Sequence, residues 1–322
     1  MLQLVNLSNY ECDMDIINHS AECLQTFLQH HHLDGIEMMI GDTWDCQVHK
    51  KEWIQGVHLH CWFNWLDFWR NNQRELLKQF SSEEEMRDCY GGVTRHEWLN
   101  VQRKHIQTAT QTGAKYLVFH VCQVRTDEMF NRQFRATDRE VIEAAVEVIN
   151  ELVDGIPDDM EILFENLWWV GLTLTDKSLT GLLLEKVKHP RVGIMLDTGH
   201  LMNVNQELKT EEEGIQYILK VVENLGEYKQ YIHGIHLHHS LSGHYSKSCK
   251  DSLPSERTTA ELMEHVLKID QHRPFGVPAV QRIIESVKPN YLVHEFLYIS
   301  MEDWSEKINI QQQALAMKGD SR

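Results

Sequence analysis

The sequence has no long apolar run, no paired cysteine motif and no excess of basic residues. It contains no stretch of about 18 apolar residues, the minimum for a membrane-spanning helix. Its 7 cysteines are scattered without a Cys-x-x-Cys pair, which indicates reduced thiols rather than a disulfide framework. Lys and Arg total 31 against 48 Asp and Glu, a net charge of −17, whereas duplex-binding proteins usually present a basic face. We therefore expect a cytoplasmic protein with neither membrane nor nucleic acid as partner.

Sequence features that would divide the chain are also scarce. No basic leader precedes an apolar segment at the N-terminus, so we expect no secretory signal. No linker rich in proline and glycine interrupts the chain, so we expect one domain over residues 1–322. No Gly-x-Gly-x-x-Gly motif follows the first apolar run, which disfavours an open dinucleotide-binding sheet.

What the chain does contain is an alternation of short apolar runs and amphipathic stretches. The apolar runs predict strands at 2–7, 35–40, 56–60, 116–121, 161–166, 192–196, 233–238 and 291–296. Helical periodicity follows at 16–28, 137–153, 215–225, 262–267 and 280–287, with capping boxes at Thr94/Glu97 and Thr137/Glu140, and with Ser300 starting a final helix. Eight alternations of strand and helix predict an α/β fold, a single-domain (β/α)₈ TIM barrel.

Two of the connections are longer than a turn and a helix require. Residues 61–93 follow the third strand, and the polar residues 239–256 follow the seventh. Long loops on compact domains usually act as lids, binding loops or oligomer contacts. The first loop carries an aromatic cluster, interpreted either as a sugar-stacking wall over the barrel mouth or as a patch buried in a homodimer: Trp62, Phe63, Trp65, Phe68 and Trp69.

Four expected strands end in a side chain of the kind that binds metal ions: Glu165, Asp197, His236 and Glu295. An ionised group taken out of water needs a partner, and the carboxyl ends of barrel strands line one mouth. Because strand side chains alternate, each of the four falls on the inward parity of its strand. We predict that they hold one divalent cation (Mn²⁺, Co²⁺, Mg²⁺ or Zn²⁺), and ordinary ion pairs are the alternative.

Other residues near these ends are candidates for the pocket wall. His200 is expected to orient a substrate oxygen or to bind a second ion, and His60 and His120 are interpreted as ligands or as polar wall groups. Trp62 and Trp168 are expected to contact substrate. The remaining histidines are interpreted as second-layer or surface groups: His58, His238, His239 and His294.

The order of the strand-end motifs carries a family resemblance. FEN at 164–166, LDTGH at 196–200, GIHLH at 234–238 and HEF at 294–296 stand in one chain, and the resemblance spans residues 2–297. On these motifs the sequence resembles the xylose isomerase-like TIM barrels. This superfamily includes sugar (phosphate) isomerases and epimerases and the abasic-site nucleases of the endonuclease IV type.

The resemblance implies an isomerase or epimerase in carbohydrate metabolism that acts on a small sugar, sugar phosphate or polyol. Glu165, Asp197, His236 and Glu295 would hold the cation, often manganese in such enzymes, and His200 would touch the substrate. Glu165 and Glu295 would be the acid–base pair that moves a proton through a metal-stabilised enediolate.

Two departures bear on which branch of the family the chain follows. Epimerases of this kind carry an Arg shortly after the metal-binding His, and the segment after His236 has none. The nuclease branch resembles the chain at His60, His120 and His200 as well as at the four predicted ligands, but it also needs an Asp-x-His pair after the seventh strand. Residues 239–256 contain no such pair, so we expect an incomplete three-metal cluster and rank the nuclease second.

Overall fold

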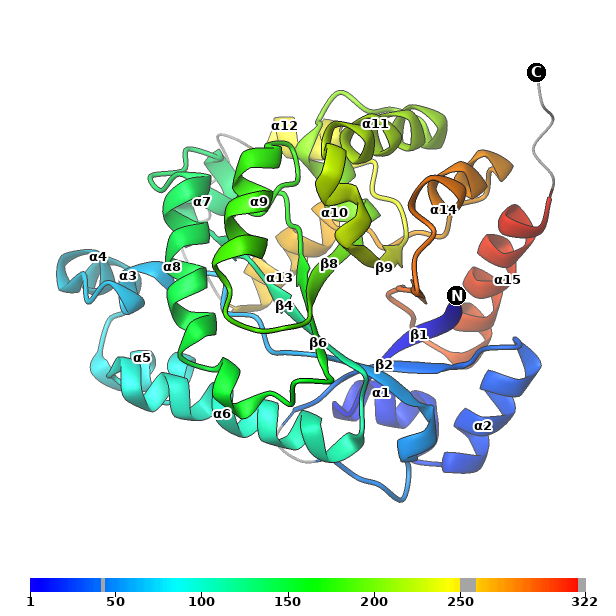
Figure 1. Cartoon of the computed structure of the whole chain (residues 1–322), viewed down its shortest axis with the longest axis horizontal. Coiled ribbons are helices and arrows are strands. Elements are labelled where there is room, and N and C mark those ends of the chain that lie inside the picture. The colour runs from blue at the N-terminus through cyan, green and yellow to red at the C-terminus, as the bar shows by residue number, and fades with distance from the viewer. Residues whose placement is uncertain (42–43, 250–258, 318–322) are drawn as a thin grey trace.

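A closed barrel of eight parallel strands with helices around it forms the body of the protein (Figure 1). The computed structural model describes residues 1–41, 44–249 and 259–317. The predicted TIM barrel is thereby confirmed. Among the described helices, none combines the length and the apolar character that crossing a membrane requires.

The eight barrel strands coincide with the eight predicted runs, apart from ends that move by one or two residues. In sequence order they are β1 Leu2–Ser8, β2 Gly35–Met39, β3 Ile54–His58, β4 Tyr116–His120, β6 Glu161–Glu165, β8 Val192–Asp197, β9 Ile232–Leu237 and β10 Tyr291–His294. A separate antiparallel pair is formed by β5 Cys122–Gln123 and β7 Val170–Gly171. The parallel register pairs His120 with Glu165 and Asp197 with His236, so the strand ends that carry polar side chains lie at one level.

Helices occupy the connections between the strands. They are α1 Glu11–Ile16, α2 Ala21–His30, α3 Leu66–Trp69, α4 Gln73–Gln79, α5 Glu83–Tyr90, α6 Arg95–Thr112, α7 Thr126–Asn131, α8 Asp138–Asn150, α9 Lys177–Lys186, α10 Thr198–Val204, α11 Glu211–Asn224, α12 Gly243–Ser248, α13 Thr259–Ile269, α14 Gln281–Val287 and α15 Met301–Ala316. Short 3₁₀ turns are η1 Lys51–Trp53, η2 Val153–Gly155, η3 Gly226–Tyr231 and η4 Pro278–Val280.

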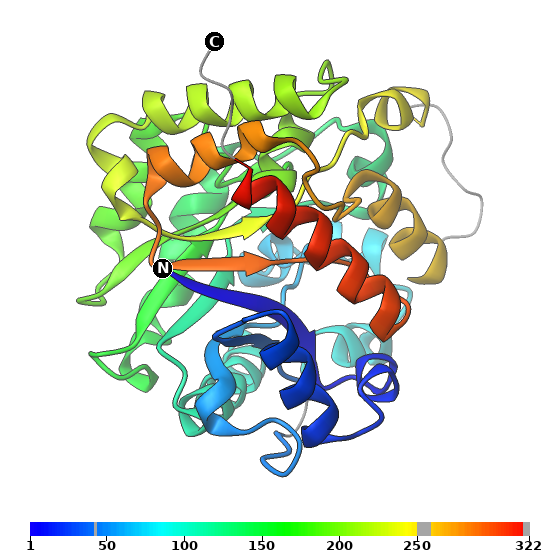
Figure 2. The same ribbon diagram turned by 90° about the vertical axis from the view of Figure 1, so that its right-hand side faces the viewer.

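Capping residues mark where several helices begin. The boxes at Thr94 and Thr137 are both formed, and the Ser300 side chain accepts a hydrogen bond from the Asp303 backbone at the start of α15. Figure 2 shows α15 lying across the outside of β10. The single helix predicted at 16–28 is wrong: α1 ends at Ile16, and Ser20 caps a second helix, α2.

The inside of the barrel below its mouth is mostly apolar. It is filled by a separate cluster of buried side chains: Leu4, Tyr116, Val118, Leu163, Met195, Tyr291 and Val293. Leu163, Met195 and Val293 each stand two residues before a predicted ligand, so the parity inferred from the sequence is confirmed. Each strand therefore changes from apolar to ligand-bearing at the same height.

The connection after β3 is not a loop but a set of helices, α3 to α6. Trp65, Phe68 and Trp69 are buried, and their rings lie 6.0, 6.0 and 6.2 Å from that of Trp98 on α6. These three are core of their own chain, so for them both the sugar-stacking wall and the dimer patch are wrong. Trp62 stays partly exposed. The second long connection contains α12, and its residues 250–256 lie outside the described part of the chain.

Candidate metal centre

The four strand-end residues singled out by the sequence lie together at the barrel mouth. His236 Nδ1 is 3.2 Å from Glu295 Oε2, 3.6 Å from Glu165 Oε2 and 3.7 Å from Asp197 Oδ2. Glu165, Asp197 and His236 are fully buried, and the Glu295 side chain is 13% exposed. The structure thus brings one oxygen of each of the three carboxylates within 3.7 Å of His236 Nδ1, while the role of the four residues as ligands stays a prediction.

The LDTGH turn holds Asp197 in place. Asp197 Oδ1 caps α10 by accepting a 2.6 Å hydrogen bond from the His200 backbone N–H. The Thr198 hydroxyl donates to the His238 carbonyl at 2.6 Å, which ties the turn to the end of β9. A Cβ on Gly199 would lie 2.1 Å from His238 Cε1, so glycine is the residue that lets the turn approach that ring. Each residue of the turn positions either a carboxylate or a histidine.

The Asn of the FEN motif locks two strand ends to one another. Asn166 Nδ2 donates to the Asp197 carbonyl at 3.0 Å, and Asn166 Oδ1 accepts from the Asp197 backbone N–H at 3.0 Å. All of these atoms are buried, where paired backbone groups avoid a desolvation penalty. The hydrogen bonds between the Asn166 side chain and the Asp197 backbone therefore fix the spacing between Glu165 and Asp197.

A second group of ligand-type atoms also contacts Glu165. His58 Nε2 is 3.0 Å from Glu165 Oε2, and His120 Nε2 is 3.2 Å from Glu165 Oε1. His58 is buried, so it is not a surface group, and its contact with the Glu165 carboxylate is one that a histidine of the second layer would make, whereas His60 lies further out along the wall. Glu165 is thus shared between this group and the four-residue group.

A third group is supplied by a loop. Asp270 Oδ2 is 3.0 Å from His200 Nε2 and 2.6 Å from His272 Nε2. Burial would lower the pKa of His272, but the carboxylate of Asp270 raises that pKa to about 9. Asp270 and His272 form an Asp-x-His pair in the connection from β9 to β10, beyond residues 239–256. The expectation that the chain lacks this pair is wrong.

His238 lies between the carboxylates of the four-residue group and His272. Its Nε2 is 2.9 Å from Asp197 Oδ2 and 3.6 Å from Glu295 Oε2, and its ring stacks on His272 at 4.1 Å. His238 is fully buried against the carboxylates, so it is not a surface group, and its hydrogen bond to Asp197 is one that a histidine of the second layer would make. His239 and His294, given the same interpretation, contact residues outside these groups: Glu211 and Gln3.

Sequence reasoning missed three residues of this region, Glu37, Asp270 and His272, and placed His58 and His238 in a second layer or on the surface. His58 is two residues from the predicted His60, and His238 is two residues from the predicted His236. Because side chains two residues apart on a strand face the same way, the alternation along β3 and β9 could have pointed to both histidines. The Asp-x-His spacing is visible at 270–272 but lies outside the long connection at 239–256.

The site mixes opposite charges in a buried place. Burial alone would raise the pKa of Glu165, but the positive charges of His120 and His236 outweigh it and hold that pKa well below its usual range. Burial raises the pKa of Glu295, which the charge of His236 offsets only in part. The surrounding carboxylates raise the pKa of His236 well above its usual value despite its burial, and a bound cation would supply positive charge to the same carboxylates.

Buried polar atoms that lack a hydrogen-bond partner indicate whether a metal ion would fit this site. Among the described residues, Glu165 Oε1, Glu295 Oε2, His120 Nδ1 and both ring nitrogens of His236 have no hydrogen-bond partner. More than nine-tenths of buried polar groups in proteins are paired, so unpaired acceptors in one cavity need a cause. Oxygen and imidazole donors that converge without hydrogen bonds fit a divalent cation.

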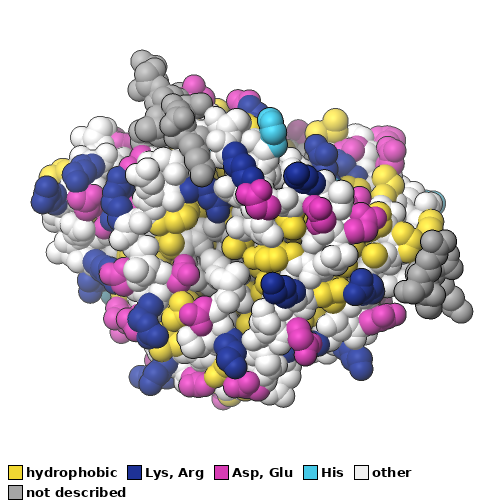
Figure 3. All heavy atoms as spheres, turned by 90° about the horizontal axis from the view of Figure 1, so that it is seen from above, with side chains coloured by type: hydrophobic (Ala, Val, Ile, Leu, Met, Phe, Trp, Pro, Cys, Tyr) yellow, Lys and Arg dark blue, Asp and Glu magenta, His cyan; other side chains and the backbone are white. Residues whose placement is uncertain are grey.

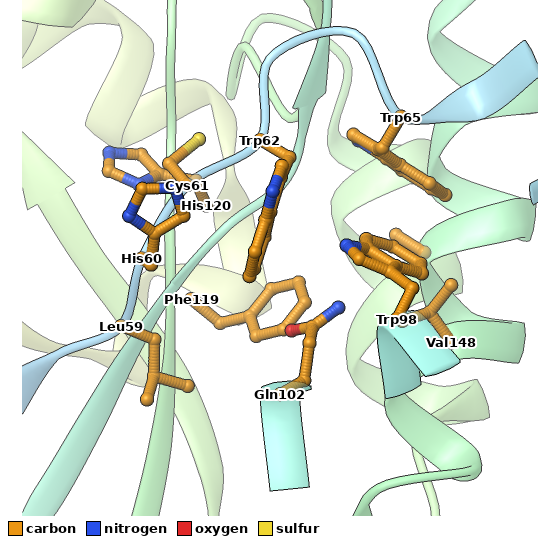
Figure 4. Close-up of a pocket in the computed structure, with 11 residues that line it drawn as sticks. Leu59, His60, Cys61, Trp62, Trp65, Trp98, Gln102, Phe119, His120 and Val148 are labelled. Atoms are coloured by element: carbon orange, nitrogen blue, oxygen red, sulfur yellow. The ribbon is translucent and has the colours of Figure 1, made fainter. Parts of the chain in front are cut away.

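The remaining predicted wall residues line the approach to His120. Figure 4 shows His60, Cys61 and His120 on one side of the Trp62 ring, and Trp65 and Trp98 on the other. Burial, followed by the nearby His105, lowers the pKa of His60 to about 4. Trp168 is buried with its ring 5.0 Å from that of His200. These residues border the groups without joining them.

Solved structures with this architecture include proteins of different activities. The chain is 12% identical to a D-tagatose 3-epimerase-like protein (98% of this chain and 97% of that one, TM-score 0.52). It is 12% identical to endonuclease IV from Thermus thermophilus (98% and 99%, TM-score 0.51). It is 14% identical to an IolI protein with a bound zinc atom (98% and 96%, TM-score 0.50). At these identities the likeness shows a common fold.

Sequence comparison identifies the family. A search of curated proteins finds no match. The family model for the xylose isomerase-like TIM barrel matches residues 89–308, which is most of the chain and includes all four predicted ligands. The chain belongs to the xylose isomerase-like TIM barrel family.

Proposed function

We propose that this protein is an enzyme with a multinuclear metal centre that cleaves phosphate esters of small substrates. The observation that carries the proposal is the third group, in which Asp270 and His272 meet His200 beside Glu165. A centre for one ion needs only four ligands, and the mouth offers more than twice that number. Glu165 lies between the groups, as a bridging carboxylate would.

The division of labour among the side chains follows from their positions. Divalent cations held by these groups would activate a water molecule and neutralise charge on a phosphoryl group. Glu295 is the most exposed of the carboxylates, and burial raises its pKa, so it is the group best suited to take a proton from an attacking water. His200 is held by the Asn166 carbonyl at 2.9 Å and by Asp270. It is therefore suited to orient a substrate oxygen rather than to transfer a proton.

The charge of the protein favours a small substrate over a nucleic acid duplex. The net charge is −17, and the face seen in Figure 3 mixes acidic and basic side chains. Duplex binding draws much of its affinity from rows of basic residues along the phosphate backbone. A small phosphorylated molecule, such as a sugar phosphate, needs only the metal centre and a few wall residues.

A sugar isomerase or epimerase with one ion is the second candidate, favoured by a specific feature. Glu165 ends β6 and Glu295 directly follows β10, two strands separated by β8 and β9, and both carboxylates approach His236 Nδ1. Carboxylates that face one point from separate strands suit proton removal on one side of a ketose and return on the other. In this alternative the four-residue group is the whole metal site, and Asp270 and His272 only support His200.

Metal content and turnover separate the two candidates. Purified protein is loaded with Zn²⁺, Mn²⁺ or Co²⁺ and desalted, and ions per chain are counted by mass spectrometry for wild type, Asp270→Asn and the exposed control Asp158→Asn. Hydrolysis of p-nitrophenyl phosphate esters and interconversion of ketoses are assayed in parallel. The proposal expects more than one ion, one fewer in Asp270→Asn, and ester hydrolysis. One ion in every variant with ketose turnover supports the second candidate. No bound ion rejects both.

A further inference from the structure

A buried glutamate lies below the predicted ligands, inside the barrel. Glu37 stands in the middle of β2 and is 2% exposed. Its Oε1 is 2.9 Å from His236 Nε2, on the side of the imidazole that faces away from Asp197 and Glu295. Burying a carboxylate at this depth is costly unless it is paired, so its partners indicate what it does.

Tyr116 fixes the other oxygen of Glu37. The Tyr116 hydroxyl donates to Glu37 Oε2 at 2.7 Å, and the tyrosine is fully buried. A Cβ at Gly56 would lie 2.1 Å from Tyr116 Cζ, so glycine in β3 leaves the space that this ring occupies. The carboxylate is therefore anchored from below by a side chain that cannot easily move.

The two ring nitrogens of His236 face different carboxylates. Nδ1 is 3.2 Å from Glu295 and faces the predicted metal position, while Nε2 faces Glu37. The contact between His236 Nε2 and Glu37 has the distance of a hydrogen bond but not the alignment of one. A metal-binding imidazole commonly donates its second N–H to a carboxylate, which fixes its tautomer and orientation.

We propose that Glu37, anchored by Tyr116, is a positioning residue that holds His236 with Nδ1 turned toward the metal centre. Glu37 accepts the Nε2 proton of His236 and thereby leaves the Nδ1 lone pair free for a divalent cation. The inference rests on the proposed function only in requiring that the four-residue group binds a metal. It holds for a multinuclear centre and for a single ion alike.

Two other roles of Glu37 make different predictions. As a plain structural ion pair with His236, Glu37 would contribute to folding and leave metal affinity unchanged. As a metal ligand with His58 and His236, which lie close enough to share an ion, its loss would remove an ion from the chain. A positioning residue lowers affinity without changing the number of ions bound.

The test measures Zn²⁺ affinity by competition with a chromophoric chelator for wild type, Glu37→Gln, Tyr116→Phe and the control Glu161→Gln. Glu37→Gln is expected to bind the same number of ions with about 10- to 100-fold lower affinity. Tyr116→Phe is expected to show a smaller loss, and Glu161→Gln, at the opposite end of β6, none. The thermal midpoint of metal-free Glu37→Gln is expected to stay at the wild-type value.

A readout without metal keeps the inference independent of the proposed function. In metal-free protein with ¹⁵N-labelled histidine, the His236 resonance is expected to report an Nε2–H that Glu37→Gln weakens. Unchanged Zn²⁺ affinity in Glu37→Gln, or the loss of a bound ion, overturns the positioning role. Wild-type protein that binds no ion at all instead rejects the proposed function, and a neutral His236 whose single proton is on Nδ1 then rejects this inference too. If Glu37→Gln does not fold, Tyr116→Phe decides by the same criteria.

Discussion

Replacing Glu165 by glutamine should weaken metal binding at both groups of the proposed metal centre that share this carboxylate. Glu165 oxygens lie 3.0 Å from His58, 3.2 Å from His120, 3.0 Å from His200 and 3.6 Å from His236. A glutamine of the same size would present one neutral oxygen and an N–H₂ group to these rings. Because the amide nitrogen cannot bind a cation, both groups that share Glu165 lose an anionic ligand.

The size of the effect follows from what one ligand contributes. Four-ligand zinc sites gain about 10–16 kcal/mol on binding, which is roughly 3 kcal/mol per ligand. At about 1.4 kcal/mol per decade, this corresponds to roughly a 100-fold weaker Kd at each group that uses Glu165. We therefore expect Glu165→Gln to retain at most the ion held by the Asp270 group after desalting.

Glu161→Gln is the matched control, because Glu161 begins the strand that Glu165 ends. The neighbouring His233 lowers the pKa of Glu161 despite its burial, and Arg191, which donates a hydrogen bond to Glu161 Oε1, adds to this effect. A lowered folded pKa contributes stability that is present above about pH 4.3, the usual value for Glu, and is lost as the pH falls through the folded value. Glu161→Gln should thus unfold at a lower temperature than wild type at neutral pH, converge with it in acid below the folded pKa, and bind metal normally.

The assay is chelator competition for Zn²⁺, with ions counted after desalting and folding checked by circular dichroism. A Glu165→Gln protein that folds and binds as many ions as wild type with similar affinity would refute the shared role of Glu165. Equal metal loss in Glu161→Gln would show that the effect comes from general destabilisation of β6.

The remaining predictions concern the LDTGH turn and the metal itself. Gly199→Ala should destabilise the protein by about 1–3 kcal/mol, because its Cβ would meet the His238 ring, whereas Gly155→Ala, whose Cβ would have its nearest neighbour at 3.9 Å, should be neutral in chemical denaturation. Asn166→Ala should cost about 1–3 kcal/mol for each Asp197 backbone group left unpaired, measured in the same way. Chelation of a metal present at about 1,000 times its Kd should remove about 4 kcal/mol of stability and lower the calorimetric Tm of this 322-residue chain by roughly 6 °C; an unchanged Tm contradicts binding to the folded state.

The strand-borne part of the site could be predicted because a barrel leaves little freedom there. Eight alternating runs fix the topology, and the two-residue period of a strand fixes which side chains face inward. Glu165, Asp197, His236 and Glu295 lie on four strands whose carboxyl ends share one rim, so their meeting at the mouth followed from the pattern.

Parity does not choose between residues two apart on one strand. His58 and His60 have the same parity in the run GVHLH, and the sequence favoured the later one because the strand was expected to end at residue 60. In the structure β3 begins at Ile54 and ends at His58, so His58 meets Glu165 while His60 faces the wall. An error of two residues in a strand boundary thus exchanged one histidine for the other.

The loop-borne part could not be predicted because no period fixes where a loop residue points. Asp270 and His272 follow α13, and their position depends on how that helix packs over the mouth. His265 of α13 lies 3.1 Å from the Met129 carbonyl, and Val266 and Ile269 belong to an apolar cluster with Trp168 and Trp169. Packing between two distant connections therefore brings the Asp-x-His pair back to His200.

Glu37 shows that the physical rule was sound but was applied too narrowly. A carboxylate in an apolar strand needs a buried partner, and this was taken as a sign of function only where the carboxylate ended the strand. In GIEMM the glutamate is the central residue, and it finds Tyr116 below and His236 above. Applied to every position of a strand, the same rule would select Glu37 from the sequence, because β2 shares the barrel interior with the strands that carry the ligands.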